Sequence, residues 1–311
     1  MKVGIIGAGN VGSTAAYAMV LEGTATEIVL IDIDRKLAAA QAEDILHATP
    51  WSHSVKIAAG DYKDLKEAKA VVLACGVSQK EGETRLDLME RNAKVFNQVI
   101  PQVTKHAKKA ILVVASNPVD IITHMVTKIS RHKTQQVIGS GTILDTARFR
   151  TLIAEHLQVS PQSVHAYVLG EHGDSEVLIW SSSRVGGMPL HEFAKQTGKP
   201  FSEDLKGDID NKVRQAAYRI IEGKGATYFG IGAGLSRIIQ AIGDDEGTVL
   251  TVSSLSRGPA DIGRVCMSVP RVVNAAGISA ELWPPLSDPE HDDLKDSAEV
   301  LIEATEKLGY T

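Results

Sequence analysis

Three glycines near the start of the chain constrain its fold more than any other feature. Gly7, Gly9 and Gly12 form a G-x-G-x-x-G pattern that follows an apolar run at 2–7 and opens a helical pattern. Asp32 ends the next apolar run, twenty residues after Gly12. A strand, a glycine turn, a helix and then an acidic residue in this order are typical of a βαβ unit that binds a dinucleotide.

Each residue of this pattern has a separate task in such a unit. The first glycine permits the tight turn, the second lets the backbone approach a pyrophosphate at the helix N-terminus, and the third lets the helix lie close to the strand. Asp32 would accept hydrogen bonds from the adenine ribose and repel a 2′-phosphate. The pattern therefore predicts NAD rather than NADP. A glycine-rich turn with a surface aspartate is the alternative, which this context disfavours.

The first half of the chain alternates apolar runs with helical patterns. The runs are continuously apolar, which predicts strands covered on both faces. The expected strands lie at 2–7, 27–32, 55–60, 70–75, 110–116 and 135–140, and helices at 10–22, 35–48 and 86–107. This alternation favours right-handed crossovers and a parallel sheet. We expect an α/β fold in which residues 1–140 form a doubly wound, parallel-sheet (Rossmann) NAD-binding domain.

The pattern changes from about residue 141. Expected elements are a helix at 142–157, strands at 164–169 and 176–182, helices at about 203–222 and 225–242, strands near 248–254 and 265–270, and a C-terminal helix at 294–309. Residues 141–311 are therefore predicted to form a second, mixed α+β domain for substrate binding and catalysis.

Charge and cysteine content narrow the function classes. The 311 residues carry a formal net charge of −5, and charges of one sign form no long run, so nucleic acid and anionic membranes are poor candidates as partners. Cys75 and Cys266 lie far apart in apolar settings, which suits a reducing compartment and disfavours a metal site. The sequence contains neither a membrane-span pattern nor a signal-peptide pattern. We expect a cytoplasmic protein.

Polar residues of the second half suggest acid–base chemistry. His172 stands between two glycines in "LGEHGDS", and its ordinary pKa suits proton transfer, although a lone histidine is more often structural. Asp145 and Arg148 are three residues apart on the expected helix and share a face. The aspartate can orient a histidine, and the arginine can grip a carboxylate. A surface ion pair is the alternative, of equal weight from this segment alone.

Two loops at the carboxyl ends of expected strands complete the candidate site. "SNPVD" (116–120) ends the fifth strand, where ligands of doubly wound sheets bind, although a plain turn would also fit. "GVSQKEGETRLDL" (76–88) follows the fourth strand and combines two glycines with many charges. We expect this segment to be a mobile lid that brings Arg85 into the site and expels water when it closes.

Together these motifs resemble the lactate/malate dehydrogenase family nearly end to end. The resemblance rests on the segments "GAGNVGS", "DILHA", "GVSQKEGETRLDL", "SNPVD", "GSGTILDTARFR", "GEHGDSE" and "GKGATYFGIG", in the family's order. It implies that His172 exchanges a proton with the substrate oxygen, that Asp145 holds and stabilises the imidazolium, that Arg148 pairs with the substrate carboxylate, and that Arg85 polarises the carbonyl. Asp145 should also raise the pKa of His172.

The resemblance also assigns binding positions. Asn117 matches a residue that contacts substrate and nicotinamide ribose, and Thr227 lies where the family lines the pocket near the substrate side chain. The positions that line the cofactor are Gly7, Gly9, Val11, Gly12, Asp32, Tyr62, Gly76, Val77, Asn117 and Ser140.

Gln79 bears on the choice of substrate. Within the family, glutamine at this position marks lactate enzymes and arginine marks malate enzymes. A neutral glutamine cannot offset the second carboxylate of oxaloacetate, and an unpaired charge in a closed site is costly. The resemblance therefore implies reduction of pyruvate to L-lactate, with a malate or a 2-hydroxyisocaproate-type dehydrogenase as the alternatives.

Arg150 is turned about 140° away from Asp145 on the expected helix. In allosteric bacterial members of the family, residues at the positions of Arg150 and His165 bind fructose 1,6-bisphosphate across a subunit interface. The resemblance thus implies activation by this sugar bisphosphate and a homotetramer. Two further classes remain, a non-catalytic NAD-binding sensor and a metal-dependent NAD hydrolase. The sensor would not need His172, Asp145, Arg148 and Arg85 together, and the hydrolase would need a metal-ligand spacing that we do not find.

Overall fold

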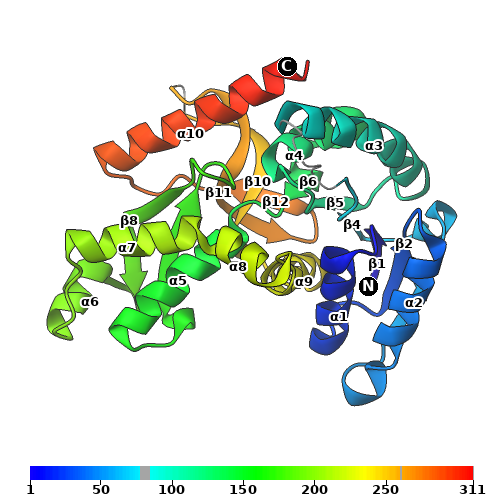
Figure 1. Ribbon diagram of the computed structural model, residues 1–311, viewed down its shortest axis with the longest axis horizontal. Helices are drawn as coiled ribbons and strands as arrows, with labels where there is room; N and C mark the ends of the chain where they lie inside the picture. Colours follow the sequence, from blue (N-terminus) through cyan, green and yellow to red (C-terminus); the bar gives the residue numbers. More distant parts are fainter. Residues whose placement is uncertain (78–84, 260, 311) are drawn as a thin grey trace.

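A nine-stranded sheet forms the centre of the protein (Figure 1). The computed structural model describes residues 1–77, 85–259 and 261–310, without the side chains of Arg85 and Leu86. The strand order is β12-β11-β10-β6-β5-β4-β1-β2-β3. Strands β1 to β6 pair in parallel, and β10, β11 and β12 continue the sheet in antiparallel fashion. The predicted α/β class, with a parallel dinucleotide-binding sheet, is confirmed.

The six parallel strands lie within the ranges expected from the sequence. They are β1 (Lys2–Ile6), β2 (Glu27–Ile31), β3 (Lys56–Ala59), β4 (Ala70–Leu73), β5 (Ile111–Val114) and β6 (Val137–Gly139). The residues of β4, β5 and β6 are all buried, whereas the edge strand β3 buries only Ile57. Continuous apolar runs thus mark the strands that are covered on both faces.

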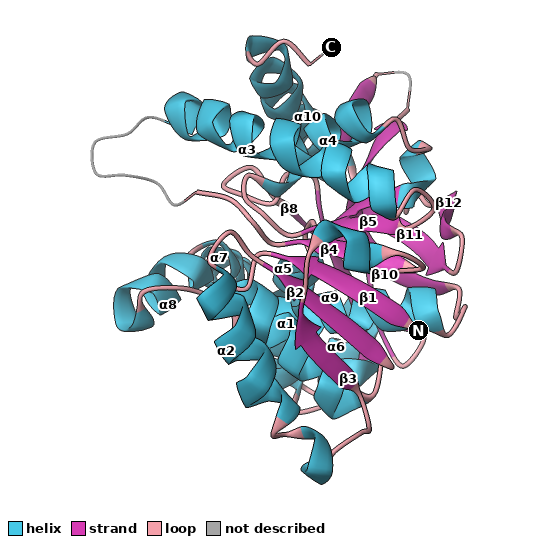
Figure 2. Cartoon of the chain, turned by 90° about the vertical axis from the view of Figure 1, so that its right-hand side faces the viewer, coloured by secondary structure: helices cyan, strands magenta, loops and turns pink. Residues whose placement is uncertain are grey.

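Helices cover the two faces of this sheet (Figure 2). On one face lie α1 (Asn10–Glu22), α2 (Arg35–Leu46) and α9 (Phe229–Gly243), and on the other lie α3 (Arg85–His106) and α4 (Val119–Ser130). The first core contains residues of α9 as well as residues of β1 and α1. Because α9 comes from the second half of the chain, the two halves share one core. Among the described helices, none is both long and apolar enough to cross a membrane.

The second half builds its own small sheet from β7 (Val164–Leu169), β8 (Val177–Val185) and β9 (Met188–Pro189). Helices α5 (Ile143–Leu157), α6 (Leu190–Gln196) and α7 (Glu203–Arg214) pack around it. Helix α10 (Asp288–Lys307) runs beside α4 and β11.

Three expected helices differ from the structure. Helix α10 begins at Asp288 and not at 294, because Ser287 and Glu290 form a capping box there. The stretch 203–222 is not one helix, because α7 ends at Arg214 and α8 (Ala216–Lys224) begins after Gln215. Helix α7 buries Ile209 and Val213 in the core, whereas none of the nine described residues of α8 is buried. Helix α8 therefore does not pack against the core that α7 covers. The next helix begins at Phe229 instead of residue 225, because Gly225 ends α8 in a left-handed conformation, with φ of 85°.

The strands of the C-terminal region were expected within the second domain, but they extend the sheet of the first. They are β10 (Thr248–Arg257), β11 (Arg264–Asn274) and β12 (Gly277–Glu281), the last of which the sequence did not predict. Ser253 of β10 pairs with Gly139 of β6. This pairing brings β11 close to the segments that carry the candidate site.

Candidate active site

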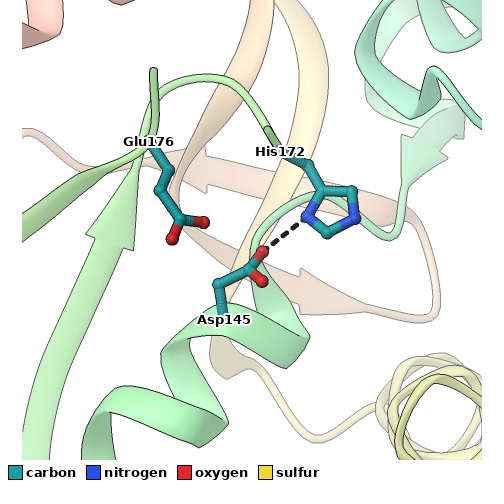
Figure 3. A group of neighbouring side chains, drawn as sticks. All are labelled: Asp145, His172 and Glu176. Carbon is teal, nitrogen blue, oxygen red and sulfur yellow. Dashed lines mark hydrogen bonds and ion pairs between the residues drawn. The ribbon is translucent and has the colours of Figure 1, made fainter. Parts of the chain in front are cut away.

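His172 and Asp145 form the centre of the site. Nδ1 of His172 lies 2.6 Å from Oδ2 of Asp145 (Figure 3). The Asp145 side chain is 2% exposed and the His172 side chain is 24% exposed. Because Nδ1 faces the carboxylate, Nε2 is the ring nitrogen that can reach a substrate. A buried carboxylate that orients a partly exposed imidazole is an arrangement suited to proton transfer.

Strand β11 holds together the two segments that carry this pair. The Oγ atom of Ser268 accepts the Thr142 N–H at the start of α5, at 3.1 Å. The Ser268 backbone exchanges two 2.9 Å hydrogen bonds with Gly170, which follows β7. Gly170 has a φ of 86°, which favours glycine and turns the chain toward His172. One buried serine thus places the helix of Asp145 beside the loop of His172.

The surroundings favour the protonated form of His172. Burial by itself lowers the pKa of His172, but the charge and hydrogen bond of Asp145, followed by the charges of Asp120 and Glu176, raise it to about 9. Burial likewise opposes ionisation of Asp145, but His172 and Arg148 hold the pKa of Asp145 below its ordinary value. At neutral pH the two groups therefore form an imidazolium–carboxylate pair.

Arg148 contacts the same aspartate from the other side. Its Nη1 lies 2.7 Å from Oδ1 of Asp145, and its side chain is only 15% exposed, so this is not a surface ion pair. Arg148 also lines a pocket of about 610 Å³, together with Thr227, Leu144 and Ile220. Two of the predicted substrate-binding residues, one from α5 and one from the connection between α8 and α9, therefore meet at one pocket.

The glycine turn has the shape that a dinucleotide requires. Gly7 has a φ of 101°, and a Cβ there would lie 2.6 Å from the backbone of Ala74. A Cβ on Gly12 would lie 1.9 Å from the carbonyl oxygen of Gly7. A Cβ on Gly9 would meet no described atom within 4 Å, and no described side chain caps the N-terminus of α1. Gly7 and Gly12 serve the fold, and Gly9 leaves open space at a helix end that attracts phosphates.

Asp32 lies beside this turn, at the end of β2. Its Oδ2 accepts the Ala8 N–H at 2.7 Å, and its Oδ1 accepts the Asp34 N–H at 2.9 Å. The carboxylate is partly exposed next to the residues that would hold the pyrophosphate. These residues fit NAD, because the acidic group is where a ribose hydroxyl would bond.

The other predicted cofactor positions gather along the same edge of the sheet. Tyr62, Gly76, Val77, Asn117 and Ser140 follow the carboxyl ends of β3, β4, β5 and β6, and Val11 lies in α1. Buried Asn92 joins two of these loops, since its Oδ1 accepts the Val77 N–H at 3.0 Å and its Nδ2 donates to the Asn117 carbonyl at 3.4 Å. The sheet thus brings together residues that are spread over the first half of the chain.

Two predicted residues lie outside what the structure describes. Gln79 is among residues 78–84, and of Arg85 only the backbone, at the first residue of α3, is described. The lid prediction for 76–88 falls largely on the same stretch.

Arg150 is directed toward β7 and not toward Asp145, as the helix geometry predicts. Its Nε donates to the Ala166 carbonyl at 2.9 Å, and its guanidinium lies 5.5 Å from the centre of the Tyr167 ring. His165 is exposed on the same strand, next to Ala166. The two residues of the predicted effector site are therefore neighbours in space.

Two acidic residues of the site were missed. Asp120 is buried at the start of α4, and its Oδ2 accepts the His172 N–H at 2.8 Å. Glu176 is 3% exposed, and it offers a ligand atom within 4.8 Å of those of Asp145 and His172. Three such groups can hold a cation, but here Nδ1 of His172 is already bonded to Asp145. Asp120 is the last residue of "SNPVD", and Glu176 is the last residue of "GEHGDSE". Both motifs contain other candidate site residues, and this shared position in a motif is the signal that could have found the two acids.

The chain is similar to known dehydrogenases along its whole length. Residues 1–139 match the family model "lactate/malate dehydrogenase, NAD binding domain", and residues 142–309 match "lactate/malate dehydrogenase, alpha/beta C-terminal domain". The L-lactate dehydrogenase of Thermus aquaticus is 54% identical over 310 residues, covering 100% of both chains. That of Allorhizobium ampelinum is 56% identical over 301 residues, covering 97% of both.

Two solved structures have the same fold. One is a lactate dehydrogenase from a deep-sea metagenome library of the Medee basin, with a TM-score of 0.96, 41% identity and 99% of both chains covered. The other is the minor L-lactate dehydrogenase of Enterococcus mundtii in a ligands-bound form, with a TM-score of 0.94, 40% identity and 98% of both chains covered.

Proposed function

The chain belongs to the lactate/malate dehydrogenase family, and we propose that it reduces pyruvate reversibly to L-lactate with NADH. NAD is the cofactor, as the glycine turn and Asp32 predict. Residues 1–140 bind it and carry Arg85, and 141–311 supply His172, Asp145 and Arg148. The choice of substrate is supported by the similarity to L-lactate dehydrogenases. The observation that carries the chemistry is the 2.6 Å contact between His172 and Asp145, with Arg148 on the same carboxylate.

His172 is the proton donor to the substrate ketone. NADH, when bound, supplies the hydride that forms the new C–H bond at C2. As the C=O π bond breaks, its electron pair moves to oxygen, and protonated His172 donates its Nε2 proton to that oxygen. Asp145 stays ionised and stabilises the imidazolium. In the reverse direction, neutral His172 accepts the proton of the lactate hydroxyl.

Arg148 holds the substrate carboxylate. Of its guanidinium nitrogens, only Nη1 is bonded to a described residue, Asp145. The remaining N–H groups can form the parallel pair of hydrogen bonds that a carboxylate accepts. Asn117 adds a contact to substrate and nicotinamide ribose, and Thr227 lines the wall near the substrate methyl group.

The loop at 76–88 selects and encloses the substrate. Arg85 polarises the carbonyl when the loop closes, and Gln79 makes no charge pair with a second carboxylate. Pyruvate is therefore preferred to oxaloacetate. This part of the proposal is supported by the resemblance of "GVSQKEGETRLDL" to the family's segment.

Measurement of NADH oxidation with pyruvate, oxaloacetate and 2-ketoisocaproate tests the substrate. We expect the highest kcat/KM with pyruvate. Gln79→Arg should raise kcat/KM for oxaloacetate relative to pyruvate by about 10- to 100-fold, because a hydrogen bond to a charged group contributes about 1.5–3 kcal/mol. Gln79→Glu is the opposite control and should lower the use of oxaloacetate further. A higher kcat/KM with oxaloacetate in the unmodified enzyme would identify a malate dehydrogenase instead.

Fructose 1,6-bisphosphate is the second element of the proposal. Arg150 reaches β7 beside the exposed His165, and an arginine next to an imidazole suits phosphate groups. The effector binds across a subunit interface of a cytoplasmic homotetramer and lowers KM for pyruvate. The test compares KM and sedimentation with and without the effector, in the unmodified protein and in Arg150→Gln. An effector that changes neither property would remove this part of the proposal and leave the reaction intact.

A further inference from the structure

A second buried carboxyl group lies beside the catalytic pair and takes no part in the reaction described above. Glu176 immediately precedes β8 and is 3% exposed. Its Oε1 is buried without a hydrogen-bond partner among the described residues. Figure 3 shows the Glu176 side chain reaching toward Asp145 and His172, and the ligand atoms of the three groups lie within 4.8 Å of one another.

Other buried acids nearby are bonded in ways that explain their burial. Glu171, in the same loop, accepts the Ser175 hydroxyl at 2.6 Å. Glu290 accepts the backbone N–H groups of Trp180 and Ser181 at 2.8 and 2.9 Å. Glu176 has no comparable bond in the described part of the chain. Burial of an unbonded carboxyl oxygen is unfavourable, so the position of Glu176 calls for a reason beyond folding.

The charged and titratable groups around Glu176 and the catalytic pair come from every element packed there. They are Asp145 and Arg148 of α5, Glu171 and His172 of the preceding loop, Asp120 of α4, Asp210 and Arg214 of α7, and Asp293 of α10. Arg214 is held by Asp210, at 2.6 Å. Burial and then the charge of Asp145 raise the pKa of Glu176 to about 8, against the opposing charges of His172, Arg214 and Arg148.

The charge balance of the site depends on this proton. With Glu176 neutral, the three side chains that the proposed function places at the substrate, the imidazolium of His172, the carboxylate of Asp145 and the guanidinium of Arg148, sum to one positive charge, which matches the single negative charge of a 2-keto acid. Other charges bond elsewhere: Asp120 to the His172 backbone N–H, Glu171 to the Ser175 hydroxyl, and Asp210 to Arg214. Ionised Glu176 would cancel the one positive charge and lie beside the incoming carboxylate. Because these groups are close together and buried, one added negative charge strongly changes the affinity of the site for a carboxylate.

We propose that Glu176 is a positioning residue that keeps the substrate site cationic while it carries a proton, and that its loss of this proton prevents productive binding of the 2-keto acid before His172 itself is deprotonated. The proposal rests on the proposed function and deepens it. Ionised Glu176 also stabilises the imidazolium, so it delays the loss of the proton from His172.

Two ionisations should therefore determine how kcat/KM falls at alkaline pH. Above about pH 9, log kcat/KM for pyruvate should fall with a slope near −2 in the unmodified enzyme, since Glu176 and His172 both lose a proton. Glu176→Gln keeps the shape and stays neutral at every pH. Its slope should be −1, and its decline should begin at higher pH than in the unmodified enzyme, because the first proton that the unmodified enzyme loses, that of Glu176, is absent. At pH 7 its KM should stay within about twofold, because Glu176 is neutral there.

NMR titration of the His172 ring gives a readout that needs no turnover. In Glu176→Gln the ring should lose its proton at lower pH than in the unmodified protein. Asp174→Asn is the matched control, because Asp174 is an exposed acid in the same loop and its removal should leave both the slope and the titration unchanged. Glu176→Asp keeps an ionisable carboxyl and should keep the slope of −2.

The outcomes separate the two proposals. A slope of −1 in the unmodified enzyme, or a slope and a His172 titration that Glu176→Gln leaves unaltered, overturns the role of Glu176. If Glu176→Gln does not fold, the slope of the unmodified enzyme and the behaviour of Glu176→Asp still decide. If the unmodified protein oxidises no NADH with any 2-keto acid, the proposed function fails, and the NMR titration alone decides whether Glu176 supports the proton on His172.

Discussion

At the scale of single residues, His172 is the group on which turnover should depend most directly. Its Nε2 is free to reach a substrate, because Nδ1 is bonded to Asp145 at 2.6 Å. His172→Asn should lower kcat by about 10²- to 10⁴-fold, the usual contribution of a positioned acid. Binding of NADH should change little, since the glycine turn and Asp32 lie on other loops. Steady-state rates and a fluorescence titration with NADH measure the two quantities.

A substitution at an exposed histidine serves as the control for this experiment. His191→Asn alters a histidine whose side chain is 78% exposed, and it should leave kcat unchanged. The role given to His172 is wrong if His172→Asn keeps more than a tenth of the original kcat.

The pH dependence of the two directions follows from the same pair of residues. The pKa of His172 is raised to about 9 in the folded protein, so the ring is protonated at neutral pH. Reduction needs the protonated ring and should fall as pH rises through this range, whereas lactate oxidation needs the neutral ring and should rise. Asp145→Asn removes the charge that raises the pKa of His172 against the effect of burial. The fall in pyruvate reduction and the rise in lactate oxidation should therefore both occur at lower pH. Rate–pH profiles in both directions provide the measurement, and an unmoved profile in Asp145→Asn would contradict it.

At the scale of elements, the turn between β1 and α1 allows structure and binding to be separated. A Cβ on Gly12 would lie 1.9 Å from the Gly7 carbonyl oxygen, so Gly12→Ala must push α1 away from β1. We expect it to lower the free energy of unfolding by about 1–3 kcal/mol, as overpacking does. A Cβ on Gly9 meets no described atom within 4 Å, and Gly9 has a φ of −69°, which alanine accepts.

Gly9→Ala should therefore fold as stably as the original protein and yet bind NADH more weakly, because its methyl group occupies space next to the pyrophosphate. Urea unfolding and NADH titration of both variants test the contrast. Equal losses of stability in the two variants would mean that Gly9 serves the fold and not the cofactor.

The sequence predicts elements well where one local signal determines them. Short apolar-rich runs identify all six parallel strands, and the spacing of Asp145, Arg148 and Arg150 predicts which of them share a helix face. The break at Gln215 and strand β12 are not predicted, because both depend on which surface the neighbouring segment covers. Glu176 is missed for a related reason. Its significance lies in its burial beside His172, and a sequence does not display burial.

At the scale of the whole molecule, the continuous sheet has a consequence for stability. Strand β10 of the second half pairs with β6, and α9 completes the core over β1 and α1. Unfolding of either half would expose apolar surface of this shared core and strand edges of the other half, although each half also has a cluster of buried residues within itself. We expect the two halves to unfold in one cooperative transition.

Two probes can test this at a fixed protein concentration. Far-ultraviolet circular dichroism reports on all helices and strands. In a background that carries Trp51→Phe and Trp283→Phe, fluorescence of Trp180 reports on the core of the second half, where its ring centroid lies 4.8 Å from that of Phe149. The two urea curves should coincide. A Cβ on Gly139 would lie 2.3 Å from the Thr123 hydroxyl and 3.0 Å from the Cβ of Ser253, so Gly139→Val should force β6 and β10 apart. The curves of this variant should separate. If the two curves already separate before this substitution, the shared sheet does not couple the two halves, and each half is stable without the contacts that α9 makes with β1 and α1.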